Sequence, residues 1–140
     1  MSNKLLVVIG GPTGVGKTDM AIRLAHHFQT EIISADSRQV YTELNIGVGR
    51  PSASQLNAIP HHLIGHISIH QDYSVAHYTN QALHILDELF LHHDMVILTG
   101  GTGLYVKAIM EGFDDIPKVE EGITERWTAL WKEQGIESLL

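Results

Sequence analysis

The chain has 140 residues, a length that predicts a single domain. Apolar residues make up 44% and charged residues 18% of it, which is ordinary for a globular fold and excludes intrinsic disorder. The lack of cysteine excludes disulfides and thiolate chemistry, and the net charge of −7 argues against a broad nucleic-acid-binding face on this segment, though not against a local basic site.

No apolar run approaches the roughly 18 residues that a membrane-spanning helix needs. The longest candidate near the N-terminus is the run 5–9, which is also too short for a signal sequence. We therefore expect a cytoplasmic protein without a membrane segment.

The first third of the chain has the pattern of a βαβ unit. Residues 4–9 (KLLVVI) are apolar and β-branched, which predicts a strand buried on both faces of a parallel sheet. A glycine-rich turn over 10–16 follows, and then apolar residues at helical spacing predict a helix over 17–28. Residues 31–34 (EIIS) predict a second strand.

The rest of the chain continues to alternate. The elements predicted there are a short helix at 52–57 within a loop-rich region 35–59, a short strand within 60–69, a helix at 75–92 with Ser74 as its N-cap, a strand at 95–99, and helices at 104–110 and 121–134. This order predicts an α/β fold in which a parallel sheet of the P-loop NTPase-like kind is flanked by helices. Residues 135–140 read as the start of a further element, so we expect residues 1–140 to be the P-loop α/β core of a longer protein.

A phosphate-binding loop joins the first strand to the first helix. The sequence GPTGVGKT matches the pattern G-x-x-x-x-G-K-[ST], and it stands between a strand and a helix as the motif requires. Its backbone amides form an anion site, its lysine adds a positive charge, and its threonine hydroxyl is placed to bind Mg²⁺. The predicted phosphate-binding residues are Gly11, Pro12, Thr13, Gly14, Val15, Gly16, Lys17 and Thr18.

The predicted catalytic carboxylate follows the second strand. The strand at 95–99 ends in Thr99 and two glycines, and Asp94 lies at its other end, which argues against a motor or G-protein type of P-loop enzyme. Ligands of open parallel sheets lie beyond the carboxyl ends of the strands, so Asp36, the phosphate loop and Thr102 should converge on one crevice. Asp36 can act there as a proton acceptor, hold Mg²⁺ through water, or merely cap a turn.

Five blocks in this order resemble the tRNA dimethylallyltransferase family, over residues 5–117. The blocks are GPTGVGKT, EIISADSRQVY, NIGVGRP, PHHLI and GGTGLYVKA. The resemblance implies transfer of a dimethylallyl group from dimethylallyl diphosphate to N6 of an adenosine next to the tRNA anticodon, with release of diphosphate. It therefore implies tRNA and the prenyl diphosphate as partners and Mg²⁺ as cofactor.

The resemblance also assigns roles to residues. Lys17, Asp36 and Thr102 would be catalytic, with Asp36 as the base that also hydrogen-bonds the adenine amino group and Thr102 touching the leaving diphosphate. The phosphate loop would hold the diphosphate, with Thr18 on Mg²⁺. Together with Asp36, three neighbouring residues would contact the tRNA: Ser37, Arg38 and Gln39.

Two departures from the family pattern stand out. Where relatives commonly read T-A-K-P, this chain has Val48-Gly49-Arg50-Pro51, which keeps the charge and loses a hydroxyl. Family members are also much longer, with helical and C-terminal segments that grip tRNA. We therefore expect this chain alone to bind the diphosphate but to be weakly active or inactive on tRNA.

Three alternatives share the phosphate loop. A small-molecule or nucleoside kinase would also bind ATP, but it usually carries lid arginines, and Arg126 is the one arginine after Arg50. A prenyltransferase acting on free adenine nucleotides shares the same blocks, so this segment separates it poorly from a tRNA enzyme. A regulatory nucleotide-binding module gives no reason for the block around Asp36.

The remaining conspicuous residues are paired histidines and aromatic side chains, for which packing roles are weighed against binding roles. The paired histidines (26–27, 61–62 and 92–93) do not predict a zinc site, because neighbouring residues of a helix point about 100° apart. The second pair can line the prenyl or base pocket or pack in the core. Tyr41 and Tyr105 can stack on a base or cover the core, and Trp127 and Trp131 form one helical face suited to packing.

Overall fold

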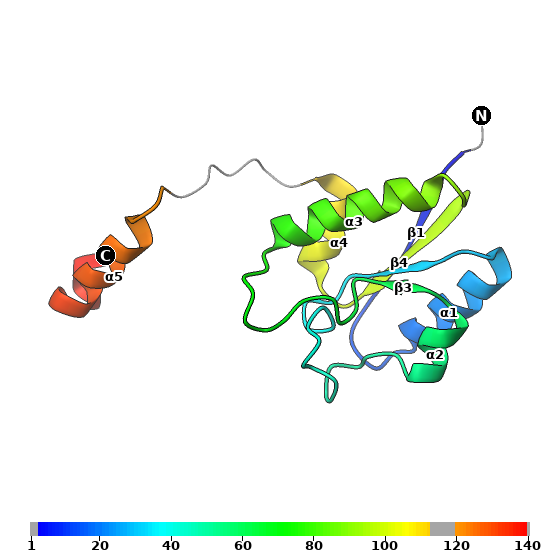
Figure 1. The fold of residues 1–140 in the computed structure, drawn as a ribbon, viewed down its shortest axis with the longest axis horizontal. Helices are drawn as coiled ribbons and strands as arrows, with labels where there is room; N and C mark the ends of the chain where they lie inside the picture. The colour runs from blue at the N-terminus through cyan, green and yellow to red at the C-terminus, as the bar shows by residue number, and fades with distance from the viewer. Residues whose placement is uncertain (1–2, 113–119, 140) are drawn as a thin grey trace.

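The computed structural model describes residues 3–112 and 120–139, and the structure lies in the predicted α/β class. Its sheet contains β1 (Leu5–Gly10), β4 (Met95–Gly100), β2 (Ile32–Ser34) and β3 (His61–His62), in the order β1-β4-β2-β3. All three strand pairings are parallel (Figure 1). The order of elements predicted from the sequence is therefore confirmed. Residues 113–117, the end of the segment resembling the family, lie outside the described residues.

Helices cover both faces of this sheet (Figure 1). The face that carries α1 (Lys17–Phe28) also carries the short α2 (Ala53–Ala58), and the other face carries α3 (Val75–Phe90) and α4 (Gly103–Glu111). None of the helices in the described residues is long and apolar enough to cross a membrane.

The two faces of the sheet form two hydrophobic clusters because successive strand residues point to opposite sides. Ile33 and Leu98 pack in the cluster beneath α3 and α4. Their neighbours Ile32 and Ile97 pack in the cluster beneath α1, whose Ala21 and Ala25 let the helix approach closely. This alternation explains why both strands carry apolar residues at consecutive positions, at 32–33 in β2 and at 95–98 in β4.

The first strand differs from its prediction. The sequence predicts burial on both faces for 4–9, but in β1 Leu5 is 51% exposed and the four residues that follow it are only half-buried. The strand order explains this, because β4 is the only strand that pairs with β1 within the described part of the sheet. An apolar sequence by itself does not distinguish an edge strand from a central one.

The long helix α3 begins as predicted. The Ser74 hydroxyl accepts a hydrogen bond from the backbone nitrogen of His77, and the His77 ring reaches back to the Ser74 nitrogen, which together make a capping box. The helix ends at Phe90, two residues before the predicted end.

Both tyrosines considered for base stacking pack in or against the core, and Tyr41 is half-buried there. Tyr105 is 6% exposed and stacks on Tyr78 at 3.9 Å between ring centroids, so it belongs to the core. The Tyr78 hydroxyl donates to the Ser34 carbonyl at 2.9 Å, which ties α3 to the end of β2. In α5 (Ile123–Gln134), which contacts the short 3₁₀ helix η1 (Ile136–Leu139), Trp127 and Trp131 are 48% and 49% exposed.

Candidate functional site

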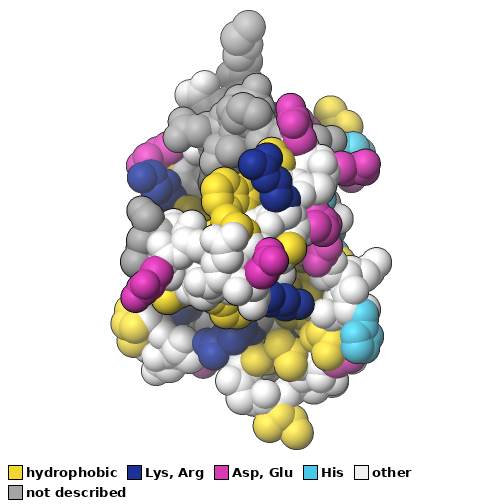
Figure 2. Space-filling model, turned by 90° about the vertical axis from the view of Figure 1, so that its left-hand side faces the viewer, with side chains coloured by type: hydrophobic (Ala, Val, Ile, Leu, Met, Phe, Trp, Pro, Cys, Tyr) yellow, Lys and Arg dark blue, Asp and Glu magenta, His cyan; other side chains and the backbone are white. Residues whose placement is uncertain are grey.

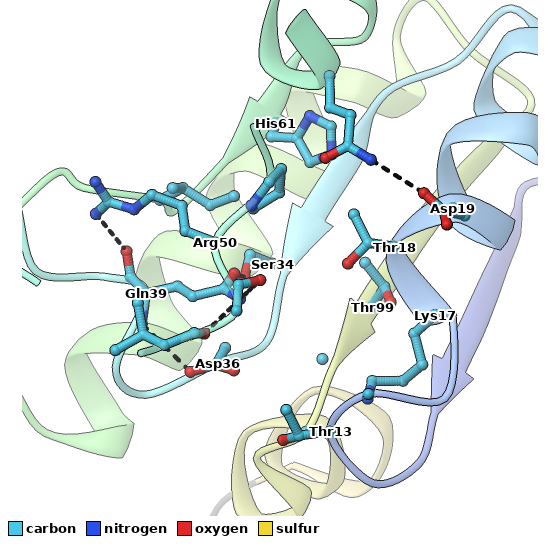
Figure 3. Close-up of a pocket in the computed structure, with 18 of the residues that line it drawn as sticks. Thr13, Lys17, Thr18, Asp19, Ser34, Asp36, Gln39, Arg50, His61 and Thr99 are labelled. Atoms are coloured by element: carbon cyan, nitrogen blue, oxygen red, sulfur yellow. Dashed lines mark hydrogen bonds between the residues drawn. The ribbon is translucent and has the colours of Figure 1, made fainter. Parts of the chain in front are cut away.

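A cavity of about 320 Å³ lies at the carboxyl ends of the strands, between the loops that follow β1, β2 and β4. Figure 3 shows Asp36 and Gln39 on one wall and Lys17 on the other. The predicted residues that line it are Thr13, Gly14, Gly16, Lys17, Thr18, Asp36 and Gln39. The convergence expected from the parallel-sheet rule therefore holds for the phosphate loop and Asp36.

The phosphate loop has the backbone that anion binding requires. Gly14 and Gly16 have φ values of 83° and 92°, a region that side chains with a Cβ rarely adopt. No side chain caps the N-terminus of α1, so its backbone N–H groups stay available to an anion. The Lys17 ammonium donates to the Pro12 carbonyl and so lies folded along the loop.

Three residues of the predicted phosphate loop do not line this cavity. Gly11 and Pro12 line a neighbouring open groove on the α4 side, and Val15 is 61% exposed. The phosphate loop therefore contributes to the cavity through Thr13, Gly14 and the residues from Gly16 into the first turn of α1.

Asp36 is held by the turn that it begins. Its Oδ1 accepts hydrogen bonds from the backbone nitrogens of Arg38 and Gln39, at 2.9 Å and 3.3 Å. No residue that the structure describes donates a hydrogen bond to the other carboxylate oxygen, Oδ2. The carboxylate is thus oriented through one oxygen while the other can serve a ligand in the cavity.

Thr102 and Ser37 pair with each other instead of lining the cavity. The Ser37 backbone nitrogen donates to Thr102 Oγ1 at 2.9 Å, and that hydroxyl donates to Ser37 Oγ at 3.2 Å. The Thr102 nitrogen also donates to the Ala35 carbonyl at 3.1 Å. The turn after β4 therefore holds the turn that carries Asp36, while the neighbouring Arg38 is exposed.

The close approach of these two turns requires a glycine at the end of β4. A Cβ on Gly100 would lie 2.1 Å from the Ala35 carbonyl oxygen, well inside van der Waals contact. At Gly103, by contrast, a Cβ would meet nothing within 4 Å.

The cavity also contains residues that the sequence analysis did not select. Ser34 is the last residue of β2 and Thr99 the last but one of the neighbouring β4, and the strand-end rule that selected Asp36 applies to them equally. Asp19 and Gln55 join α1 to α2 through a hydrogen bond of 3.0 Å. No sequence signal connects these last two residues, because they are 36 positions apart.

Arg50 and His61 belong to the blocks that resemble the family, and both line the cavity. The Arg50 guanidinium donates to the carbonyls of Gln39 and Tyr41, so its terminal nitrogens serve the protein itself. The His61 Nδ1 lies 2.7 Å from the Ile59 carbonyl, which makes it the donor and leaves Nε2 as a buried acceptor with no partner among the residues that the structure describes. Burial lowers the pKa of His61 below its ordinary value, which favours the neutral ring.

The charges of the site are few and local. Of the residues lining the cavity, Lys17 and Arg50 are basic and Asp19 and Asp36 acidic. The described residues contain no group of three or more His, Asp or Glu side chains arranged to hold a metal ion. Elsewhere the charges are mixed, and the face seen in Figure 2 carries basic and acidic side chains side by side. The arrangement suits a small polyanion on the phosphate loop with a carboxylate across from it.

Comparisons with known proteins agree on one family. The IPP transferase family model matches residues 39–140, which is more than half of the chain. The chain is 47% identical to tRNA dimethylallyltransferase 1 of Bacteroides thetaiotaomicron over 134 residues, covering 96% of this chain and 44% of the relative. It is 48% identical to the tRNA dimethylallyltransferase of Christiangramia forsetii over 139 residues, covering 99% of this chain and 46% of that relative.

A solved structure gives the same result. The full-length tRNA isopentenylpyrophosphate transferase of Bacillus halodurans superposes with a TM-score of 0.77 at 34% identity, covering 98% of this chain and 46% of that structure. The chain thus spans less than half the length of the relatives it matches. With the phosphate loop and Asp36 on one cavity, and with matches in sequence and fold along nearly the whole chain, the chain belongs to the IPP transferase family.

Proposed function

We propose that the protein containing this chain transfers a dimethylallyl group from dimethylallyl diphosphate to N6 of a tRNA adenosine next to the anticodon, in the cytoplasm. The observation that carries this proposal is the shared cavity, in which the Asp36 carboxylate lies across from Lys17 and Thr18. The activities by which its relatives are named support both the prenyl group and the tRNA.

The leaving group determines what the phosphate loop does. As the bond between the allylic carbon and the diphosphate oxygen breaks, negative charge develops on the diphosphate. The N–H groups at the start of α1 and the Lys17 ammonium, both beside the cavity, stabilise that charge. The carbon that is left carries partial positive charge and receives the adenine nitrogen.

The incoming nitrogen determines what Asp36 does. The N6 lone pair is delocalised into the adenine ring, so the nitrogen becomes acidic only as the new C–N bond forms. The free oxygen of Asp36 then accepts one N6 proton, and the product is the neutral secondary amine. The hydrogen bonds from Arg38 and Gln39 to Oδ1 keep the carboxylate turned for this transfer.

The residues fit a magnesium ion held mainly by the substrate. Mg²⁺ is usually bound through one or two protein oxygens together with phosphate oxygens and water, and the Thr18 hydroxyl lines the cavity beside the phosphate loop. Thr18 would hold the ion, which when bound supplies further charge stabilisation to the diphosphate.

The tRNA would approach from the side of the Asp36 turn, where Arg38 is exposed. The target adenosine has to leave its stack for N6 to reach a carboxylate inside a cavity. Ser37 and Arg38 follow Asp36 in the chain and would meet the nucleotides around the flipped base.

The test combines a binding assay with a product assay. The chain is titrated with dimethylallyl diphosphate and, separately, with ATP, using Lys17→Met as the binding-deficient variant and Lys4→Met, just before the start of β1, as the matched control. Unmodified tRNA is then incubated with chain, Mg²⁺ and dimethylallyl diphosphate, and its nucleosides are analysed by mass spectrometry. Binding of the prenyl diphosphate that depends on Lys17, or a dimethylallyladenosine peak, supports the proposal; a clear preference for ATP overturns it in favour of a kinase.

A further inference from the structure

One wall of the cavity is a loop that lacks regular structure. Residues 46–51, here called the covering loop, contain no helix or strand and make no backbone–backbone hydrogen bond with the residues that the structure describes. Val48 is nevertheless only 7% exposed, while Ile46 is 93% exposed at the tip. The loop also passes close to the phosphate loop, since a Cβ on Gly49 would lie 4.0 Å from Thr13 Cγ2. Side chains must therefore hold it in place.

Gln39 supplies the first attachment. Its Nε2 donates to the carbonyls of Val48 and Gly49, at 3.2 Å and 3.0 Å. Its Oε1 accepts from the Ser34 hydroxyl at 3.2 Å, at the end of β2. The side-chain amide therefore bridges the sheet and the covering loop. At the same time the backbone nitrogen of Gln39 donates to the Asp36 carboxylate.

Arg50 supplies the second attachment, from the loop back to the chain around Gln39. Its Nη2 donates to the carbonyls of Gln39 and Tyr41, at 3.2 Å and 2.7 Å, and Nη1 donates to the Asn45 side chain. Gly65 leaves room for this guanidinium, because a Cβ there would lie 2.8 Å from Nη2.

These contacts compete with the ligand roles that the residue types suggest. The Gln39 amide uses both its oxygen and its nitrogen within the protein, and Arg50 directs both terminal nitrogens to protein oxygens. The Nε2 hydrogens of Gln39 and the Nη2 hydrogens of Arg50 cannot bind a tRNA or a phosphate without giving up these hydrogen bonds, three of which are part-buried, and that costs free energy.

We propose that Gln39 and Arg50 form a clasp that fixes the covering loop against the phosphate loop, and that they are positioning residues for the diphosphate of the donor. The proposal rests on the proposed function for the identity of that diphosphate. The clasp also links the donor side to Asp36, because Gln39 holds the covering loop with its side chain and the Asp36 carboxylate with its backbone nitrogen.

The clasp itself can be tested without any ligand. The chain contains no cysteine, so Ile46→Cys on the covering loop and Leu83→Cys on α3 can be labelled with nitroxides and the distance distribution between them measured. We expect Gln39→Ala and Arg50→Met to broaden this distribution, and the matched control Arg23→Met, an exposed arginine of α1, to leave it unchanged. An unchanged distribution in both clasp variants would overturn the proposal.

Titration with inorganic diphosphate tests the consequence for binding. We expect each single variant to bind roughly tenfold more weakly, and the double variant to bind little more weakly than the worse single one, because the two residues act as one unit. In the prenyl-transfer assay the change should appear in KM for the prenyl diphosphate more than in KM for tRNA, and Arg50→Lys should restore part of it. Multiplicative losses in the double variant would contradict the clasp.

The two proposals fail in different ways. A wild-type chain that does not bind diphosphate contradicts the proposed function, while the nitroxide distances still decide whether the clasp exists. A wild-type chain that binds diphosphate, together with clasp variants that bind it equally well, contradicts the clasp alone.

Discussion

Thr102 Oγ1 lies 2.9 Å from the backbone nitrogen of Ser37, so the turn after β4 accepts a hydrogen bond from the turn that carries Asp36. The resemblance to the family implies that Thr102 touches the leaving diphosphate. In the structure its hydroxyl meets Ser37 through two hydrogen bonds and is absent from the lining of the cavity. If the protein has the proposed function, a hydroxyl placed in this way acts on the reaction through the position of the carboxylate.

Thr102→Val should therefore reduce kcat for prenyl transfer roughly tenfold and leave the affinity for dimethylallyl diphosphate within about twofold. The valine removes the acceptor of the Ser37 N–H, and a small displacement of a catalytic group is costly. Thr102→Ser keeps the hydroxyl and should be close to wild type. Steady-state kinetics with both substrates distinguish this positioning role from direct contact with the diphosphate. Direct contact would instead raise KM for the prenyl donor in the valine variant.

Asp36→Asn should slow prenyl transfer by roughly 10²–10⁴-fold, the usual contribution of a general base. The asparagine oxygen can still accept from the nitrogens of Arg38 and Gln39, so the turn is kept while the basic carboxylate is lost. Single-turnover kinetics with bound donor measure the chemical step, and a titration with dimethylallyl diphosphate serves as the control for binding. Wild-type turnover in this variant would exclude Asp36 as the base.

Gly100→Ala should destabilise the fold by about 1–3 kcal/mol or more, as overpacking of a filled interior does. The new methyl group would need the place of the Ala35 carbonyl, which is backbone and cannot turn aside. Gly103→Ala is the matched control, since its Cβ meets open space and alanine favours a helix. Urea unfolding of the two variants compares them, and equal stabilities would mean that the turns separate easily.

His61 should make the stability depend on pH below about 6.5. Burial lowers its pKa in the folded state below the ordinary value of 6.5, so the unfolded chain binds the proton more readily. The stabilising contribution is fully present above pH 6.5 and is lost as the pH falls toward the lowered pKa. Unfolding free energies of wild type and His61→Gln, measured between about pH 5 and 7.5, should converge as the pH falls. A difference that is constant over this range would contradict the lowered pKa.

The amino-acid sequence by itself determined the order of helices and strands, the phosphate loop, and the meeting of that loop with Asp36. These features depend on local signals: apolar periodicity, glycines that allow positive φ, and a serine that caps α3. The rule that parallel strands present their carboxyl ends at one edge extends the local signals to a shared cavity. The same rule also predicts that Ser34 and Thr99 lie at this cavity, as they do.

The tertiary structure alone decided which partners the side chains of the site use. Gln39 and Arg50 carry groups suited to a tRNA or a phosphate, and their hydrogen bonds to the covering loop and the neighbouring chain follow from where those segments pass in space. Thr102 and Ser37 are 65 residues apart, and their pairing requires the close approach at Gly100. The exposure of β1 likewise follows from strand order, which depends on contacts between distant segments. The apolar pattern of the strand itself does not indicate its place in that order.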